Sequence, residues 1–319
     1  MRTKMNTVLA LLAICGLAIG SSAVLGQQQG SAPTDGQQVQ PPTQQPVGQQ
    51  DENVQAVQEA VDQKAEDLES QRRKQVVQDA VAALNEATAA LRHLDEGRHE
   101  QAVAALERSV GKLELVLRRA PDLALAPVDV STTVYDLYLD RRSIEDAIDE
   151  AERLIDRGRI QDARRLLDLL RSEIITSTTY LPMLTFPDAI AEVAPLIDQG
   201  KYDQARALLA STLNTVVVVN RTTALPILRA ELLLDEAEAL AERSDRTEQD
   251  NERLAQLLDS AEEQLRIADV LGYGDEGDFE PFYEELKSIR QKTRGGKSGK
   301  GLFTTLRNGL RTLGEKIAG

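Results

Sequence analysis

The chain has few aromatic residues and no tryptophan: Phe, Tyr and Trp together account for 3% of its 319 residues. A core without large rings has to be built from Ala, Leu, Val and Ile, which suits closely packed helices. The only cysteine, Cys15, lies in the N-terminal segment, so the rest of the chain has no disulfide and no thiol chemistry. With only His93 and His99, most acid–base and nucleophilic schemes lack their usual groups. We therefore expect no enzyme activity and no cofactor.

Basic residues are outnumbered: 37 Lys and Arg stand against 52 Asp and Glu, which gives a net charge of −15. Nucleic-acid binding needs a basic surface that neutralises phosphates, so we expect no nucleic-acid partner. The two histidines flank one predicted turn, with no nearby cysteine or carboxylate set to complete a metal site. We therefore expect no metal.

The N-terminus has the pattern of a secretory signal peptide over residues 1–26. Arg2 and Lys4 precede a short apolar run, and small residues around Ala23 and Gly26 offer two cleavage sites. An uncleaved signal anchor is the alternative. Residues 27–50 are mostly Gln, Pro and Gly, a composition that predicts a disordered linker. From the signal-peptide pattern we expect a periplasmic protein.

Three similar segments contain a glycine between two amphipathic runs, at Gly97, Gly158 and Gly200. A glycine takes the left-handed conformation without strain, so each segment predicts a helical hairpin. The glycines are 61 and 42 residues apart, unlike the repeat of about 34 residues of a tetratricopeptide solenoid. We predict an all-α fold over residues 51–294, an irregular bundle in which the three duplicated hairpins pack side by side.

Two β-branched segments follow the second and third hairpins, at residues 174–179 and 216–219. They are either a short two-stranded β ribbon or the buried ends of helices. Residues 123–130 are apolar and are expected to be an extended connector. The best ligand-pocket candidates lie near these segments. Tyrosine suits contact with a small molecule because it combines an apolar ring with a polar tip. They are Asp129, Tyr135, Asp136, Tyr138 and Tyr180; the alternative is that the tyrosines are ordinary core residues.

The C-terminus is basic, with nine Lys and Arg and one acidic residue from Lys287 onward. Residues 295–301 read GGKSGKG, but Gln291 stands where a phosphate-binding loop has its first glycine, so we reject that motif. We predict a Gly/Lys linker and a basic amphipathic helix over residues 295–319. This helix has three possible roles: contact with a membrane surface, docking on a partner, or folding back on the acidic body.

Several phrases resemble the bacterial YfdX family. They occur in order as KLELVLRRAPDLALAPVDV (112–130), VYDLY (134–138), TYLPMLTFPDAI (179–190), LPILRAE (225–231), LGYG (271–274) and GGKSGKG (295–301). The resemblance covers roughly residues 72–314. It implies a helix-rich, often secreted protein associated with stress responses, with suggested small-molecule binding and oligomerisation and without an accepted catalytic site.

We therefore expect a non-enzymatic, stress-associated periplasmic protein, a homo-oligomer that binds a small molecule or a protein partner on a helical-hairpin scaffold. The alternative is a self-assembling protein whose C-terminal helix mediates oligomerisation or membrane-surface contact.

Overall fold

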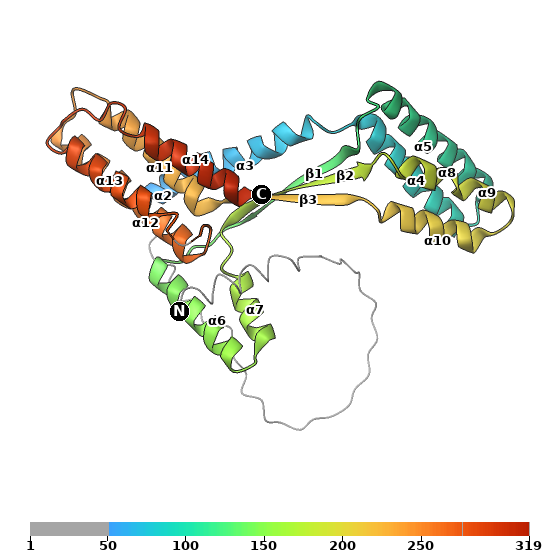
Figure 1. Cartoon of the computed structure of the whole chain (residues 1–319), viewed down its shortest axis with the longest axis horizontal. Coiled ribbons are helices and arrows are strands. Elements are labelled where there is room, and N and C mark those ends of the chain that lie inside the picture. The colour runs from blue at the N-terminus through green and yellow to red at the C-terminus, as the bar shows by residue number, and fades with distance from the viewer. Residues whose placement is uncertain (1–50, 276, 319) are drawn as a thin grey trace. The chain divides into compact units, whose positions relative to one another are not determined.

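A computed structural model describes residues 51–275 and 277–318 (Figure 1). The predicted signal peptide and Gln/Pro linker lie outside the described residues. Most described residues are helical and one sheet is present, which confirms the expected fold class. The chain forms two compact units. Among the described residues, unit 1 comprises 51–57, 136–171, 229–275 and 277–313, and unit 2 comprises 58–135, 172–228 and 314–318.

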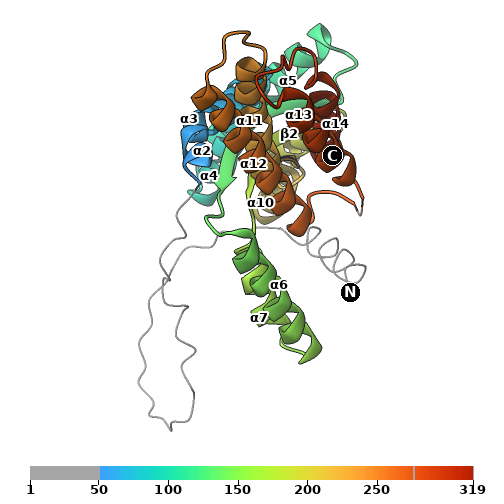
Figure 2. The same cartoon turned by 90° about the vertical axis from the view of Figure 1, so that its left-hand side faces the viewer.

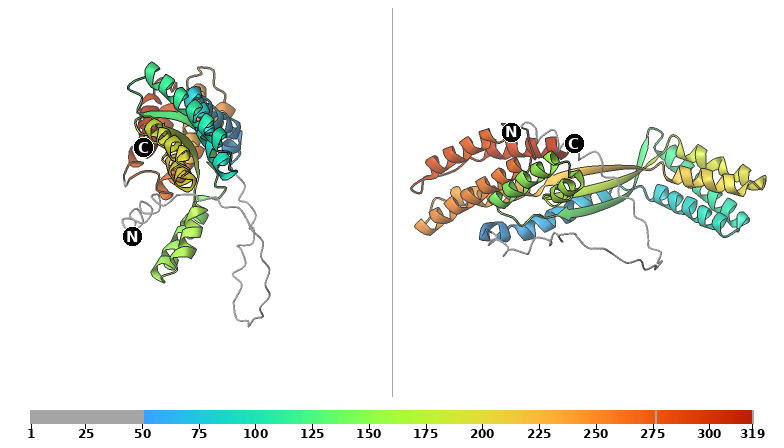
Figure 3. Two further views of the ribbon diagram at one scale, coloured as in Figure 1. Left: turned by 90° about the vertical axis from the view of Figure 1, so that its right-hand side faces the viewer. Right: turned by 90° about the horizontal axis from the view of Figure 1, so that it is seen from below.

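The helical part of unit 2 is built from the first and third hairpins. The first consists of α4 (Gln78–Asp95) and α5 (His99–Arg119). The third consists of α8 (Phe186–Ala191), α9 (Val193–Asp198) and α10 (Tyr202–Leu213). Helix α4 packs against α10, and α5 packs against α8 and α9, so the two hairpins form one bundle (Figure 3). The buried side chains at these contacts are small or aliphatic, among them Ala83, Ala87, Ala90, Ala102, Ala105, Ile190, Val193, Ala205 and Leu209.

All three hairpins turn in the same way. Gly97, Gly158 and Gly200 have φ values of 72°, 76° and 71°. At each turn the glycine N–H donates to the carbonyl three residues earlier, and the next N–H donates to the carbonyl five residues before it, with N–O distances of 2.8–3.1 Å. This is the hydrogen-bond pattern of a Schellman motif. The turn predicted from the glycines is therefore confirmed in each copy.

The β-branched segments are strands of an antiparallel sheet in unit 2. Strand β1 (Leu125–Tyr135) pairs with β2 (Glu173–Pro182), which pairs with β3 (Val217–Ala224). The two exits form the predicted ribbon, and the apolar connector adds a third strand. Helix α3 (Gln58–Arg73) packs on β1, where Arg73 donates to the Val130 carbonyl at 3.3 Å. β-Branched side chains favour this outcome because they fit a pleated surface better than a helix end.

Unit 1 contains the remaining helices. They are α2 (Glu52–Ala56), α6 (Arg141–Asp156), α7 (Ile160–Asp168), α12 (Glu248–Val270), α13 (Glu280–Thr293), most of α11 (Leu225–Ala241) and most of α14 (Thr304–Ala318). The longest, α12, starts with a capping box: Thr247 accepts from the Asp250 N–H, and the Asp250 carboxylate accepts from the Thr247 N–H. This arrangement satisfies two backbone donors that a helix start leaves unpaired.

The expectation that all three hairpins pack side by side is wrong for the second one. Helices α6 and α7, which lie side by side in Figure 2, belong to unit 1 and not to the bundle of unit 2. Ile144 and Ile148 on α6 form an apolar cluster with Leu170 and with Leu271 from the end of α12. The first and third hairpins already bury their apolar faces on each other, so the second is left to pack elsewhere.

The C-terminal segment folds back on unit 1. The Gly299 N–H donates to the Ala241 carbonyl at 2.8 Å, and Arg246 donates to the Lys297 carbonyl at 2.6 Å. A Cβ at Gly299 would lie 2.6 Å from the Ala241 Cβ, so only glycine allows this approach. Helix α14 buries Leu306, Leu310 and Leu313, and its Arg307 forms ion pairs with Asp235 and Glu238 on α11. Folding back is thus the arrangement adopted.

Within residues 51–275 and 277–318, no helix is both long and apolar enough to cross a membrane.

Candidate functional site

The five residues predicted from the sequence do not form one cluster within a unit. In unit 2, Asp129 lies exposed on β1 opposite Thr179, next to the β-bulge that follows Pro127, and Tyr180 lies on β2 opposite Pro127. Tyr135 lies at the other end of β1, opposite Glu173. Asp129 and Tyr180 are therefore one step apart along the β1–β2 ladder, and Tyr135 lies at the far end of β1.

Asp136 and Tyr138 belong to unit 1, and they differ in exposure. Tyr138 is 49% exposed, whereas Asp136 is engaged inside the unit. Arg229 on α11 donates to both Asp136 carboxylate oxygens, at 2.9 and 2.7 Å. The two side chains are only 4% and 11% exposed, so the ion pair is buried. This carboxylate holds α11 to the segment that precedes α6, and it is not open to a ligand.

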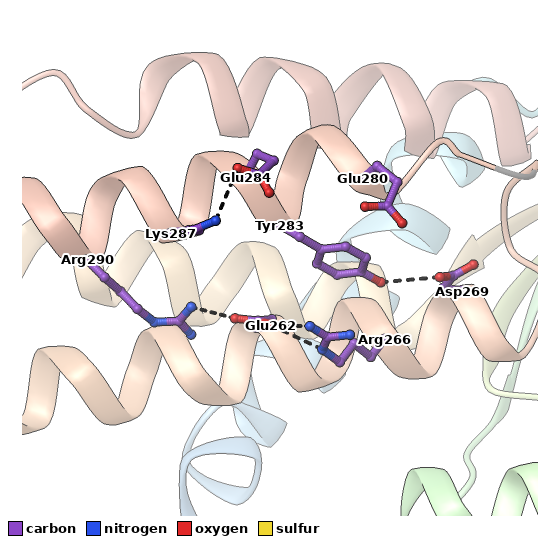
Figure 4. Close-up of a pocket in the computed structure, with 8 residues that line it drawn as sticks. All are labelled: Glu262, Arg266, Asp269, Glu280, Tyr283, Glu284, Lys287 and Arg290. Atoms are coloured by element: carbon purple, nitrogen blue, oxygen red, sulfur yellow. Dashed lines mark hydrogen bonds and ion pairs between the residues drawn. The ribbon is translucent and has the colours of Figure 1, made fainter.

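A cavity of about 430 Å³ lies between α12 and α13 in unit 1 (Figure 4). From α12 it is lined by Glu262, Arg266 and Asp269. From α13 it is lined by Glu280, Tyr283, Glu284, Lys287 and Arg290. These positions recur at three- and four-residue steps on each helix, so they form one polar face per helix.

The basic side chains of the cavity are mostly engaged. Arg266 donates to Glu262 at 2.6 and 3.1 Å, and Arg290 reaches Glu262 and Asp259, the latter at 2.7 Å. Burial of Glu262 opposes its ionisation, but the hydrogen bonds from the two guanidinium groups outweigh this and lower the pKa of the carboxyl. Hydrogen bonding to Glu262 likewise raises the pKa of Arg266. The end of the cavity around Glu262 is therefore occupied by a network of ion pairs.

The other end of the cavity is acidic and surrounds a tyrosine. The Tyr283 hydroxyl donates to Asp269 at 3.4 Å, and the Arg266 guanidinium lies over the ring, 4.6 Å from its centre. Burial raises the pKa of Tyr283 well above its ordinary value, and the charges of Asp269 and Glu280 add to the rise. The hydroxyl therefore stays protonated and remains a hydrogen-bond donor at neutral pH.

The acidic end presents Asp269, Glu280 and Glu284, of which only Glu284 has a basic partner in the cavity, Lys287 at 3.7 Å. Among the described residues, no group of three His, Cys, Asp or Glu side chains is placed to hold a metal ion.

Sequence reasoning missed this cavity, although a signal exists. Charged residues repeat on α12 as Glu262, Arg266 and Asp269 and on α13 as Glu280, Glu284 and Lys287, at helical spacing. Such repeats are common on solvent-facing helices, so spacing alone does not indicate that two of them face each other.

Comparison with known proteins supports the resemblance seen in the sequence. Residues 80–222 match the family model described as YfdX protein, which confirms the resemblance over this segment. A solved structure of YfdX from Salmonella Typhi is 22% identical, with a TM-score of 0.32, and the match covers 47% of this chain and 93% of that chain. No curated protein matches the chain. The cavity between α12 and α13 lies outside the segment that the family model matches.

Proposed function

We propose that this chain is a non-enzymatic, stress-associated binding protein of the periplasm, and that the cavity between α12 and α13 binds a small organic amine. The observation that carries the ligand proposal is the acidic end of the cavity. The periplasmic location rests on the signal-peptide pattern at residues 1–26, and the stress association rests on the resemblance to the YfdX family.

The charge distribution favours an ammonium group over an anion. Both guanidinium groups of the cavity are engaged with Glu262, whereas Asp269 and Glu280 lack an ion pair with either of them. An ammonium has three donors and a compact charge, which Asp269 and Glu280 can accept without breaking an ion pair, and Glu284 offers a third carboxylate that it would share with Lys287. The ring of Tyr283 gives the aliphatic part of such a ligand an apolar surface.

Isothermal titration calorimetry with spermidine and cadaverine tests the proposal. We expect both to bind and the uncharged 1,5-pentanediol not to bind. The double variant Glu280→Gln/Glu284→Gln should weaken amine binding by about 10-fold or more, because it removes two exposed carboxylates of the site.

The matched control for this experiment is Glu100→Gln/Glu114→Gln, which removes the same charge from exposed positions on α5 in unit 2. If both double variants weaken amine binding equally, amine binding depends on the net charge of the protein and not on the cavity. Absence of amine binding to the unaltered protein would reject the ligand proposal.

The location is tested separately. We expect the protein to be released from cells by osmotic shock, with an N-terminus that begins after Ala23 or Gly26. Retention in the cytoplasmic fraction with residues 1–26 intact would contradict it.

Self-association is our second proposal, favoured by apolar side chains exposed on the second hairpin. Ile160 is 51% exposed and Leu169 is 69% exposed. The C-terminal helix is a weaker choice for contact with a partner or a membrane, because burial of Leu306, Leu310 and Leu313 covers its apolar stripe. Sedimentation equilibrium should show an oligomer, and a monomer at every concentration would reject this proposal.

A further inference from the structure

The bundle of unit 2 shows how two hairpins of this type pair. Helix α4 is the first helix of its hairpin and packs on α10, the second helix of the other. Helix α5 packs on α9 in the equivalent way. In both contacts the first helix of one hairpin packs on the second helix of the other, which is the pattern of an approximate two-fold relation (Figure 3 shows the two hairpins in one bundle).

Two contacts mark this pairing near the turns. His99 and Tyr202, each the second residue after its glycine, stack with ring centres 3.6 Å apart and planes 1° from parallel. Arg206, six residues after Gly200, pairs at 2.7 Å with Asp95, two residues before Gly97. In this ion pair the carboxylate comes from one hairpin, two residues before that hairpin's glycine. The guanidinium comes from the other hairpin, six residues after its own glycine.

The second hairpin has the same turn and both halves of this ion pair. Asp156 lies two residues before Gly158, and Arg164 lies six residues after it. Ile160 takes the position of the stacked rings and is 51% exposed. Arg164 is half-exposed, and its nearest carboxylate is that of Asp168, at 3.9 Å.

The apolar residue three positions before the glycine also differs in burial between the hairpins. Leu94 and Ile197 are buried in the core of the unit 2 bundle, whereas their counterpart Ile155 is partly exposed. No other described helix of unit 1 lies beside the turn of α6 and α7 in Figures 1 and 2. The second hairpin therefore presents the face that its two relatives bury, and no described element of unit 1 covers it.

We propose that the α6–α7 hairpin binds the α6–α7 hairpin of a second copy of this chain about a two-fold axis, as the first hairpin binds the third. Ile160 then packs on Ile160 of the second copy, and Arg164 pairs with Asp156 of the second copy twice. This inference rests on the self-association proposed above and names its surface.

A second copy fits better than an unrelated protein because the charges are self-complementary. An isologous interface requires that one surface carry both members of each cross-pair. The second hairpin has Asp156 and Arg164 at the two positions that form the ion pair in unit 2, whereas the first hairpin has Val103 in place of the arginine. The second hairpin can therefore repeat the pair observed in unit 2 symmetrically.

Charge reversal tests the ion pair. Asp156→Arg and Arg164→Asp each place two pairs of like charges across the interface, so each should raise the dimer dissociation constant by about 10-fold or more in sedimentation equilibrium. The double variant restores opposite charges and should return the constant to within about 3-fold of the original value. The matched control is Asp146→Arg, at an exposed position on the same helix about 15 Å from Asp156. It should change the dimer dissociation constant little.

Cysteine cross-linking provides a second test that does not depend on charge. In a chain carrying Cys15→Ser, Ile160→Cys should form an oxidised dimer, because the axis brings the two Cβ atoms within disulfide reach. Arg165→Cys, exposed on another face of α7, should not. Thermal unfolding followed by circular dichroism shows whether each variant is folded.

The outcomes separate the two claims. A monomer at all concentrations overturns self-association and the interface together. An oligomer that keeps its dissociation constant in both charge-reversed variants overturns the interface and leaves self-association standing. Loss of the dimer in both single variants without recovery in the folded double variant overturns the Asp156–Arg164 pair.

Discussion

The buried ion pair between Asp136 and Arg229 allows a strong test of the structure. The Arg229 guanidinium is 4% exposed and donates to the two Asp136 oxygens at 2.7 and 2.9 Å. Asp136→Ala removes both oxygens, and Asp136→Asn removes the negative charge and one of them. A buried charge that loses its partner is strongly destabilising, because burial has already removed the water that would replace the partner. Asp136 was also a predicted ligand residue, so the same variant separates a structural role from a binding role.

The expected loss is about 3–5 kcal/mol of unfolding free energy for Asp136→Ala, with Asp136→Asn toward the lower end because its amide oxygen still accepts one hydrogen bond. A double variant, Asp136→Leu/Arg229→Met, is the control. Replacing both members of a buried pair with apolar side chains of similar size is often close to neutral. We therefore expect the double variant to be more stable than Asp136→Ala.

Urea unfolding followed by far-ultraviolet circular dichroism measures the effect at neutral pH. The two units can unfold in separate transitions, and the change should appear in the transition that belongs to unit 1. Amine binding to the folded Asp136→Asn variant should remain, because Asp136 does not line the cavity. A loss of less than about 1 kcal/mol for Asp136→Ala would refute the assigned burial of this pair.

Three further outcomes are expected. Gly299→Ala should destabilise the packing of α14 by about 1–3 kcal/mol, because its Cβ would lie 2.6 Å from that of Ala241; an unchanged urea midpoint would contradict this. The pKa of Glu262 is lowered below its ordinary value of 4.5 on folding, so its stabilising contribution is present above that pH and is lost as the pH falls through the folded-state pKa. Glu262→Gln should therefore flatten the acid limb of the stability profile, and an unaltered limb would show that other carboxylates control it. Tyr202→Leu should lower the stability of unit 2 by about 1 kcal/mol through loss of the stack on His99, as measured by urea unfolding, and His99→Leu serves as the companion variant.

Local structure was largely predictable from the chain. A glycine between two amphipathic runs predicts a helix stop, a left-handed residue and a new helix, and Gly97, Gly158 and Gly200 all have positive φ. Alanine five residues after each glycine predicts close helix packing, and Ala102, Ala163 and Ala205 are all buried. These features depend on residues close together in the chain, where steric and hydrogen-bonding preferences act directly.

The strands were only partly predictable. The β-branched residues at 174–179 and 216–219 left a ribbon and buried helix ends as alternatives, because intrinsic strand preference is weak and depends on the neighbouring strand. Pairing with β1 decided the outcome, and that partner lies far away in the sequence.

The candidate site depended entirely on tertiary structure. Glu262 and Tyr283 look like ordinary residues of two exposed helices until α12 and α13 bring them to one cavity. In the same way, Asp136 looked like a ligand residue until Arg229 was placed against it.

The sequence alone determined the helical hairpins, their turns and the small side chains that allow close packing, since each follows from steric preferences within a few residues. Tertiary structure decided that the first and third hairpins pair while the second lies in the other unit. Three similar amphipathic faces can be matched in several ways, and long-range contacts such as that of Ile144 with Leu271 select one of them.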